Sequence, residues 1–182
     1  MDKVVLEKEI YYYKNVFNNS SLFMKNIHES NLNWRDWYSS DGSIIYGKVA
    51  GGINVLPEEI LTTLKSAVFN SLYDYCLNNN KDLGFVPEFY TIQKYNVGAY
   101  MGPHVDSTDK TISKFPTISM VVYLNDDYEG GEIEFPKQDI SLKPEAGSII
   151  IFPSYDPYTH DPKPVISGDK YMSPVFCFKE AF

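Results

Sequence analysis

The order of patterns along the 182-residue chain predicts an α+β fold in which helices support a β-sandwich or barrel. Two observations carry this prediction. Two segments with helical periodicity lie in the first half, and from Pro87 onward short strand-like segments alternate with turn signals. No internal repeat, low-complexity run or interdomain linker divides the chain. We therefore expect one domain, residues 1–182, in which residues 1–86 support a β-rich core formed by residues 87–182.

The first elements are predicted from local patterns. Residues 4–16 contain the tyrosine-rich stretch Glu9–Lys14 and are predicted to form one strand. Asn19 and Ser20 are typical caps for a helix that runs to about His28, with apolar side chains on one face. Because a histidine in a last helical turn suits the helix dipole, we interpret His28 as a structural residue.

An aromatic segment, residues 32–43, follows this helix and is predicted to be irregular. Its side chains Trp34, Trp37 and Tyr38 either pack over the core or line a groove, and the pattern does not decide between the two. Residues 44–53 are then predicted to form a short strand that ends at two glycines.

The clearest helix is predicted to begin after Pro57, since proline is favoured in a first helical turn. Glu58 and Glu59 add negative charge where the helix dipole stabilises anions. The helix is expected to end near Asn78 and to lie on the outside of a sheet. Its apolar positions, which repeat with a period of 3.6 residues, are Leu61, Leu64, Val68, Leu72 and Tyr75.

The second half is predicted to contain six short strands that are separated by turn residues. These strands are residues 88–95, 119–125, 131–136, 140–142, 148–152 and 170–178. Strands of this length in close succession are typical of a β-sandwich or barrel.

The composition excludes several classes of protein. Cys76 and Cys177 form no CxxC pair, so we expect buried free thiols and no zinc site or disulfide framework. No apolar run approaches the roughly 20 residues of a membrane span, and the N-terminal residues lack the order of a signal peptide. We therefore expect a soluble, cytoplasmic protein. Nothing in the sequence indicates the oligomeric state.

The charge of the chain argues against binding to nucleic acid. The formal net charge is −8, whereas nucleic-acid-binding proteins usually carry a basic stripe. Arg35 is the only arginine. A buried cation that binds a ligand carboxylate is therefore expected to be a lysine.

The pair His104 and Asp106 is the first candidate for chemistry. Residues i and i+2 of a β-strand point to the same face, so this His-x-Asp pattern is expected to place an imidazole beside a carboxylate. A second histidine would complete the set of two histidines and one carboxylate that typically binds non-haem Fe(II). The chain has three histidines. If His28 is structural, His160 is the remaining candidate.

Lys170 is a second candidate, at the start of the last predicted strand. It alternates there with Met172, Pro174, Phe176 and Phe178, so its side chain is expected to share a face with large apolar residues. Burial of an ammonium is costly unless an anion pairs with it. A ligand carboxylate would explain this placement, although a lysine at a strand end can also extend to water.

The segment from about Tyr90 to Phe178 resembles the 2-oxoglutarate and Fe(II)-dependent oxygenases, specifically the prolyl 4-hydroxylase-like branch. The stretches that carry the resemblance are KYNVGAYMGPHVD, SMVVYLNDDYEGGEIEFP, LKPEAGSIIIF and FPSYDPYTHDPKPVISGDKY. They cover about half of the chain in the family's order and spacing. The resemblance implies a double-stranded β-helix, which is a jelly-roll barrel of the cupin type, with an iron site at its open end.

The resemblance also implies roles for individual residues. His104, Asp106 and His160 match the iron ligands, and Lys170 takes the place of the basic residue that pairs with the distal carboxylate of 2-oxoglutarate. Tyr95 matches a tyrosine that helps to hold this carboxylate. A further residue, Ser119, is assigned to the co-substrate site, at a position where the family usually has threonine.

The implied reaction is the oxidative decarboxylation of 2-oxoglutarate to succinate and CO2, with Fe(II), O2 and ascorbate, coupled to hydroxylation of a substrate. The branch suggests peptidyl proline in an extended segment. The candidates to contact it are Tyr100, Trp34, Trp37, Tyr38 and Phe176. Two departures from the family bear on this substrate: Phe176 stands where tryptophan is common, and the arginines that hold the peptide are absent.

Other functions remain open at the level of the sequence. The substrate is alternatively a free amino acid, a small metabolite or another protein side chain. A cupin-like module that binds a metal without turnover is the non-enzymatic alternative. Oxidative demethylation of nucleobases is disfavoured by the charge and by the scarcity of arginine.

Overall fold

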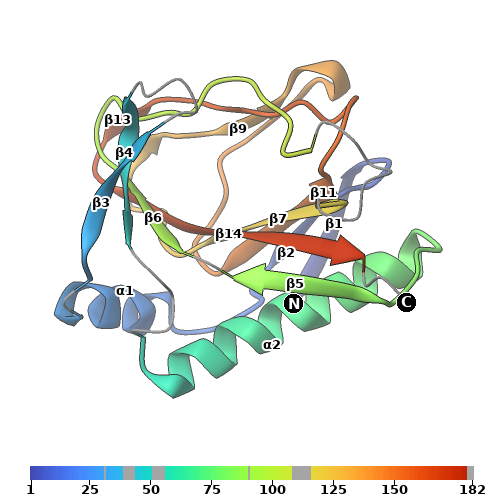
Figure 1. Ribbon diagram of the computed structural model, residues 1–182, viewed down its shortest axis with the longest axis horizontal. Coiled ribbons are helices and arrows are strands. Elements are labelled where there is room, and N and C mark those ends of the chain that lie inside the picture. Colours follow the sequence, from blue (N-terminus) through green and yellow to red (C-terminus); the bar gives the residue numbers. More distant parts are fainter. Residues whose placement is uncertain (31, 39–43, 51–55, 90, 108–115, 180–182) are drawn as a thin grey trace.

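The computed structural model describes residues 1–30, 32–38, 44–50, 56–89, 91–107 and 116–179 (Figure 1). Most of the described strands belong to one large antiparallel sheet. Its order is β1 (Asp2–Glu7), β2 (Ile10–Lys14), β11 (Ser148–Pro153), β7 (Ile118–Tyr123), β14 (Lys170–Lys179), β6 (Ile92–Tyr95), β4 (Ile44–Ala50) and β3 (Trp34–Tyr38), and β5 (Phe85–Phe89) pairs with the second half of β14.

Two small sheets face the large one. The first contains β10 (Ile140–Leu142), β9 (Ile133–Phe135) and β12 (Asp161–Pro162), and a short 3-10 helix, η2 (Pro136–Gln138), joins β9 to β10. The second contains β8 (Glu129–Gly130) and β13 (Val165–Ser167). The large and small sheets together form the double-stranded β-helix that the sequence predicted.

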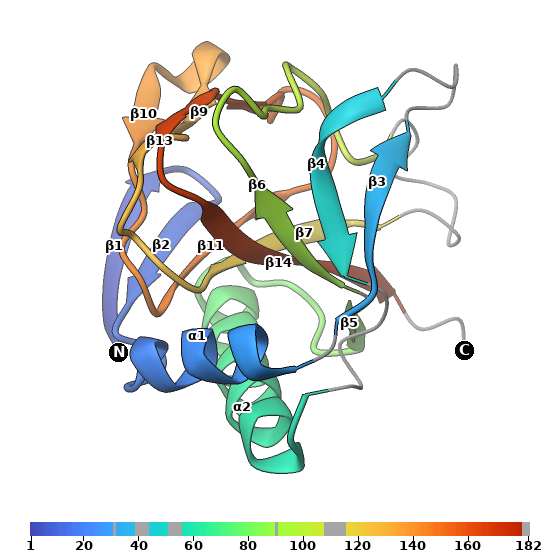
Figure 2. The same ribbon diagram turned by 90° about the vertical axis from the view of Figure 1, so that its left-hand side faces the viewer.

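The two helices, α1 (Ser20–Glu29) and α2 (Glu58–Asn78), lie on the face of the large sheet opposite the small sheets (Figures 1 and 2). This arrangement creates two hydrophobic cores because successive side chains of a strand point to opposite faces. On β11, Ile149 and Ile151 belong to the core beneath the helices, whereas Ile150 and Phe152 belong to the core between the sheets. The candidate site lies on the side of this second core.

Several predicted elements are confirmed, and others differ. Helix α2 and strands β10 and β11 lie where the sequence placed them. Residues 4–16 are not one strand: β1 and β2 form a hairpin, with Glu9 at a positive φ of 63° in its turn. The aromatic segment 32–43 is not wholly irregular, because residues 34–38 form β3 against β4. Asn19 occupies the N-cap of α1 but makes no side-chain cap bond.

Both cysteines are buried and free, as expected. Within the described residues, neither helix combines the length and the apolar character needed to cross a membrane. The division into one supporting and one core region stays a prediction.

Candidate metal and co-substrate site

The two candidate histidines are brought together by their own backbones. The His104 N–H donates to the His160 carbonyl and the His160 N–H donates to the His104 carbonyl, both at 2.9 Å. This reciprocal pair places the two residues directly opposite each other, with ring centroids 4.2 Å apart. An isolated antiparallel bridge thus joins segments that are far apart in sequence.

Backbone carbonyls set the orientation of both imidazoles. His104 Nδ1 lies 2.8 Å from the Gly102 carbonyl, and His160 Nδ1 lies 3.4 Å from the Tyr158 carbonyl. A carbonyl can only accept, so in each neutral ring the proton resides on Nδ1 and the lone pair on Nε2. Both Nε2 atoms face Asp106.

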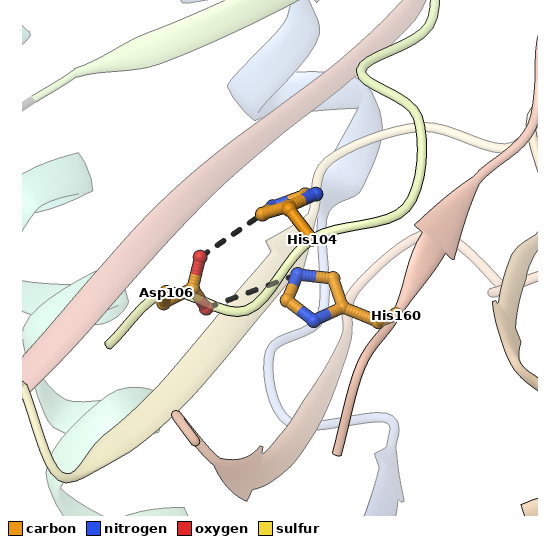
Figure 3. A group of neighbouring side chains, drawn as sticks. All are labelled: His104, Asp106 and His160. Atoms are coloured by element: carbon orange, nitrogen blue, oxygen red, sulfur yellow. Dashed lines mark ion pairs between the residues drawn. The ribbon is translucent and has the colours of Figure 1, made fainter. Parts of the chain in front are cut away.

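Asp106 completes a compact group of three potential ligands (Figure 3). Its Oδ1 is 3.5 Å from His104 Nε2 and its Oδ2 is 3.8 Å from His160 Nε2. The sequence pattern placed His104 and Asp106 on one β-strand, and this detail is wrong. His104 forms only the isolated bridge and Asp106 lies outside any strand, yet the two side chains still converge.

The pKa shifts of His160 and Asp106 suit metal binding. Burial lowers the pKa of His160 to about 4, so this ring is neutral at neutral pH. Burial alone would raise the pKa of the Asp106 carboxyl, but its hydrogen bonds with His104 and Ser119 lower it below its usual value. Asp106 is therefore an anion. The pKa of His104 is lowered by burial but raised overall by its hydrogen bond to Asp106, which requires a proton on Nε2, so a metal ion bound there would replace this proton.

These residues fit a divalent ion. One ligand atom from each of the three side chains lies within 4.8 Å of the others, so small side-chain movements bring all three onto one ion. Two imidazole nitrogens and one carboxylate oxygen are the donor set of non-haem Fe(II) sites, which leave further positions open. His28, by contrast, lies on α1 with its ring 5.7 Å from that of Tyr171, apart from this group.

Lys170 is buried on the same side of the sheet as the three ligands. Its side chain is 3% exposed and its Nζ donates to the Gly131 carbonyl at 2.6 Å. Burial lowers the pKa of Lys170 to about 8, and Glu132 only partly offsets this effect. No carboxylate of the described residues lies within 4.0 Å of the ammonium. Among the described residues, the cation therefore has unused hydrogen-bond donors and no carboxylate at ion-pair distance.

Three tyrosine rings surround the Lys170 ammonium. Its Nζ lies 5.3 Å from the ring centroid of Tyr123 and 5.9 Å from those of Tyr95 and Tyr128. Aromatic faces attract a cation within about 6 Å and exclude water from it. The Tyr95 hydroxyl donates to Gln93 Oε1 at 2.9 Å, which leaves its lone pairs for another donor. The rings thus hold the ammonium in place in a dry environment.

A single pocket of about 120 Å³ connects Lys170 with the three metal-ligand candidates. Most of its lining is apolar, and its polar side chains are Gln93, Tyr95, His104, Asp106, Tyr123, His160 and Lys170. A small diacid bound here would have one end near the lysine and the other near the histidines. Such a pocket is typical of a small-molecule site with a few oriented polar groups.

The other predicted site residues are found in different places. Phe176 lines the pocket, and Tyr100 is 47% exposed beside the pocket residue Met101. Trp34 packs against Tyr171 beneath the sheet, with ring centroids 6.1 Å apart, which agrees with a core role. The side chains of Trp37 and Tyr38 lie outside the described part of the chain. Ser119 donates its hydroxyl to Asp106 Oδ2 at 2.5 Å.

Two residues of the site were not predicted from the sequence. Tyr123 lines the pocket and has the ring nearest to the Lys170 ammonium. Tyr123 follows Ser119 by four residues on β7, and side chains of a strand alternate between its two faces, so both lie on the same face. This alternation could have identified Tyr123 as a site residue from the sequence. Ser154 lies 2.8 Å from Ser119 through their hydroxyls. Nothing local distinguishes it from other serines.

Residues 90–177, which include His104, Asp106, His160 and Lys170, match the family profile described as the 2OG-Fe(II) oxygenase superfamily. This segment belongs to the 2OG-Fe(II) oxygenase superfamily. A comparison of the sequence of this chain with those of curated proteins gives no match.

Solved structures of prolyl hydroxylases share the fold of this chain at low sequence identity. One is the Trichoplax adhaerens prolyl hydroxylase in complex with a peptide fragment of the hypoxia inducible factor oxygen degradation domain, with a TM-score of 0.71 at 17% identity, covering 94% of this chain and 84% of that chain. The viral collagen prolyl hydroxylase of Paramecium Bursaria Chlorella virus-1, in complex with 2OG, has a TM-score of 0.64 at 18% identity. The match covers 95% of this chain and 97% of that chain. A Pseudomonas putida prolyl-4-hydroxylase has a TM-score of 0.63 at 15% identity, and the match covers 95% of this chain and 94% of that chain.

Proposed function

We propose that this protein is an Fe(II)- and 2-oxoglutarate-dependent dioxygenase that hydroxylates peptidyl proline. The balanced reaction consumes peptidyl proline, 2-oxoglutarate and O2 and yields peptidyl hydroxyproline, succinate and CO2. The observation that carries the proposal is the buried Lys170 ammonium, which has no carboxylate at ion-pair distance among the described residues and shares a pocket with His104, Asp106 and His160. Membership of residues 90–177 in the oxygenase superfamily supports the reaction class.

The residues have separate tasks in this proposal. His104, Asp106 and His160 would hold Fe(II), which when bound supplies the activation of O2 that is coupled to decarboxylation of 2-oxoglutarate. Lys170 pairs with the distal carboxylate of the co-substrate and fixes its orientation, because burial strengthens this ion pair. The tyrosines around Lys170 exclude water from the pair. The chemistry belongs to the cofactor, and the chain binds, orients and shields.

The peptidyl substrate is inferred from the relatives. Three of the similar structures are prolyl hydroxylases, and one of them was solved with a peptide fragment. Phe176 and the half-exposed Tyr100 offer aromatic surface at and beside the pocket for a proline ring. Proline-rich segments dock on such surfaces because their extended conformation loses little entropy on binding.

The test is an assay of succinate formed from 2-oxoglutarate, with Fe(II) and ascorbate, in the presence of proline-containing peptides. We expect peptide-dependent succinate and a mass gain of one oxygen atom on a proline of the peptide. His104→Ala should abolish both products while the far-UV circular dichroism spectrum is retained. Succinate release that no peptide stimulates would contradict the peptidyl substrate, and the absence of succinate under all conditions would contradict the oxygenase.

A small-molecule substrate is the second candidate. The scarcity of arginine favours it, because Arg35 is the only arginine available to hold a peptide backbone. The same assay with free amino acids and small metabolites separates the two candidates. Stimulation by free proline, without stimulation by peptides, would favour the second.

A further inference from the structure

A chain of two buried hydroxyls ends on the candidate metal-ligand carboxylate. Ser119 Oγ, on β7, lies 2.5 Å from Asp106 Oδ2, and Ser154 Oγ, just after β11, lies 2.8 Å from Ser119 Oγ. Both serines are only 1% exposed. Water therefore does not compete for these hydrogen bonds.

The direction of the hydrogen bonds follows from the chemistry of the groups. An ionised carboxylate can only accept, so Ser119 must donate its single hydroxyl proton to Asp106. Ser119 then accepts from Ser154, which gives the order Ser154 to Ser119 to Asp106. We call this chain of donors the hydroxyl relay. In a buried environment each bond in such a chain polarises and strengthens the next.

The backbone of Ser154 is tied to both sides of the relay. Its carbonyl accepts from the Ser107 N–H at 2.8 Å, next to Asp106 in sequence. Its N–H donates to the Thr117 carbonyl at 3.1 Å, two residues before Ser119. Ser154 thus holds together the loop that carries Asp106 and the strand that carries Ser119.

We propose that Ser119 and Ser154 are positioning residues that orient Asp106 as a metal ligand, with Ser154 acting through Ser119. Asp106 lies outside any strand, so no ladder of backbone bonds fixes its side chain. The relay occupies Oδ2 and fixes the rotation of the carboxylate. The other oxygen, Oδ1, then remains directed towards His104 Nε2 at 3.5 Å. The proposal rests on the proposed function in one respect, namely that Asp106 binds the metal.

The test measures Mn²⁺ affinity of the metal-free full-length protein, by isothermal titration calorimetry. Loss of an outer partner of a metal ligand typically weakens metal binding about 10- to 100-fold, and we expect this loss for Ser119→Ala. Ser154→Ala should weaken binding by a smaller factor. Because both serines act along one chain, the double variant should bind no more weakly than Ser119→Ala alone. Ser119→Thr retains the hydroxyl and should restore most of the affinity.

Ser173→Ala is the matched control. Ser173 is a fully buried serine on neighbouring β14, and its hydroxyl donates to the Thr91 carbonyl, outside the relay. This variant loses a buried hydroxyl but should keep the wild-type Mn²⁺ affinity. If Ser119→Ala does not fold, Ser154→Ala compared with Ser173→Ala decides the question.

The possible outcomes distinguish a failure of the hydroxyl relay from a failure of the proposed function, in which Asp106 binds the metal. Mn²⁺ affinity of Ser119→Ala or Ser154→Ala equal to that of Ser173→Ala would overturn the relay, although the oxygenase could still be active. A raised KM for 2-oxoglutarate in Ser119→Ala with unchanged Mn²⁺ affinity would also overturn it, since Ser119 would then contact the co-substrate. A wild-type protein that binds no Mn²⁺ would contradict the proposed function itself.

Discussion

At the scale of single residues, Lys170 is a buried cation whose placement costs folding free energy. Its ammonium is buried with a backbone carbonyl as hydrogen-bond acceptor and with no carboxylate in ion-pair distance among the described residues. A lowering of the pKa from 10.5 to about 8 corresponds to about 3 kcal/mol at neutral pH. This free energy opposes folding. Binding of an anionic ligand beside the ammonium would offset this cost.

The first prediction concerns Lys170→Met, which keeps the length of the side chain and removes its charge. We expect the affinity for 2-oxoglutarate to fall at least about tenfold, because an unmade charge-assisted bond costs about 1.5–3 kcal/mol. The free energy of unfolding of the ligand-free protein should not fall, and should rise if the packing is good. Calorimetry and urea unfolding measure the two quantities. Lys25→Met, at an exposed side chain of α1, should change neither.

The second prediction concerns pH. In the unfolded chain Lys170 has its ordinary pKa near 10.5, whereas burial lowers it to about 8 in the folded protein. Between these values the unfolded state binds more protons, so the stability of the ligand-free protein gains a contribution as pH rises through this window. The contribution is complete above pH 10.5 and is lost below pH 8. Affinity for 2-oxoglutarate should change in the opposite direction and decline above pH 8.

Titration calorimetry and urea unfolding at several pH values between 7 and 10.5 check this prediction. Lys170→Met serves as the reference, because both trends that originate from the lysine should be absent in it. Equal pH dependence of 2-oxoglutarate affinity in the two proteins would mean that another group controls binding.

Single residues also show how far the sequence alone can be interpreted. The two histidines and the aspartate were predictable because the chain has so few histidines and because His-x-Asp is a compact pattern. Lys170 was predictable because its alternation with apolar residues implied burial. Ser154 was not, since its role depends on Ser119 and on a contact across 35 positions that no local pattern encodes.

Among the elements, the turn that contains Gly130 and Gly131 links the small sheet to the lysine. Gly130 has a φ of 70°, and a Cβ there would lie 2.5 Å from the Pro164 carbonyl oxygen. The next carbonyl, that of Gly131, accepts the Lys170 hydrogen bond. The pairing of β8 with β13 therefore depends on the absence of a side chain, and the position of the ammonium depends on the same turn.

The third prediction follows from this turn. At Gly98, φ is 82° and no atom lies within 4 Å of a new Cβ. Gly98→Ala should therefore lower the free energy of unfolding only by the cost of the left-handed backbone conformation, about 1–2 kcal/mol. Gly130→Ala has the same backbone cost and a clash with backbone in addition, so its free energy of unfolding should fall further. Only Gly130→Ala should weaken 2-oxoglutarate binding. Equal stability of the two variants in urea would show that the Pro164 segment moves aside freely.

The elements that the sequence predicted are those with enough residues to show a period. Helix α2 has 21 residues and β11 has six, and both were found. Strands β8 and β12 have two residues each and are defined by pairing with distant partners. The hairpin β1–β2 was missed because its turn has Glu9 at a positive φ, where sequence patterns lead one to expect glycine or asparagine.

At the scale of the whole molecule, the candidate metal site joins two parts of the chain that meet between the sheets. The segment of His104 and Asp106 and the segment of His160 are held to each other by two backbone hydrogen bonds. A bound ion would add a further link between them. Ligands that bind only the folded state stabilise it by mass action.

The fourth prediction is that Mn²⁺ raises the thermal unfolding midpoint, and that 2-oxoglutarate raises it further only when Mn²⁺ is present. At 100 times the dissociation constant, one ligand adds about 2.7 kcal/mol to the free energy of unfolding. Differential scanning fluorimetry measures the shift. Asp106→Asn keeps the size of the side chain but should lose the response to Mn²⁺. A full response in this variant would show that the ion binds elsewhere.

The pocket lining has one more consequence, for the lifetime of the enzyme. Met101, Met120 and Met172 all border the cavity, and thioethers are readily converted to sulfoxides. Met24, by contrast, packs with the core beneath the sheet. If the proposed function holds, peptide mapping after incubation with 2-oxoglutarate and no substrate should find sulfoxide at the three cavity methionines before Met24. Activity should then decline in proportion to the turnovers that are not coupled to a substrate.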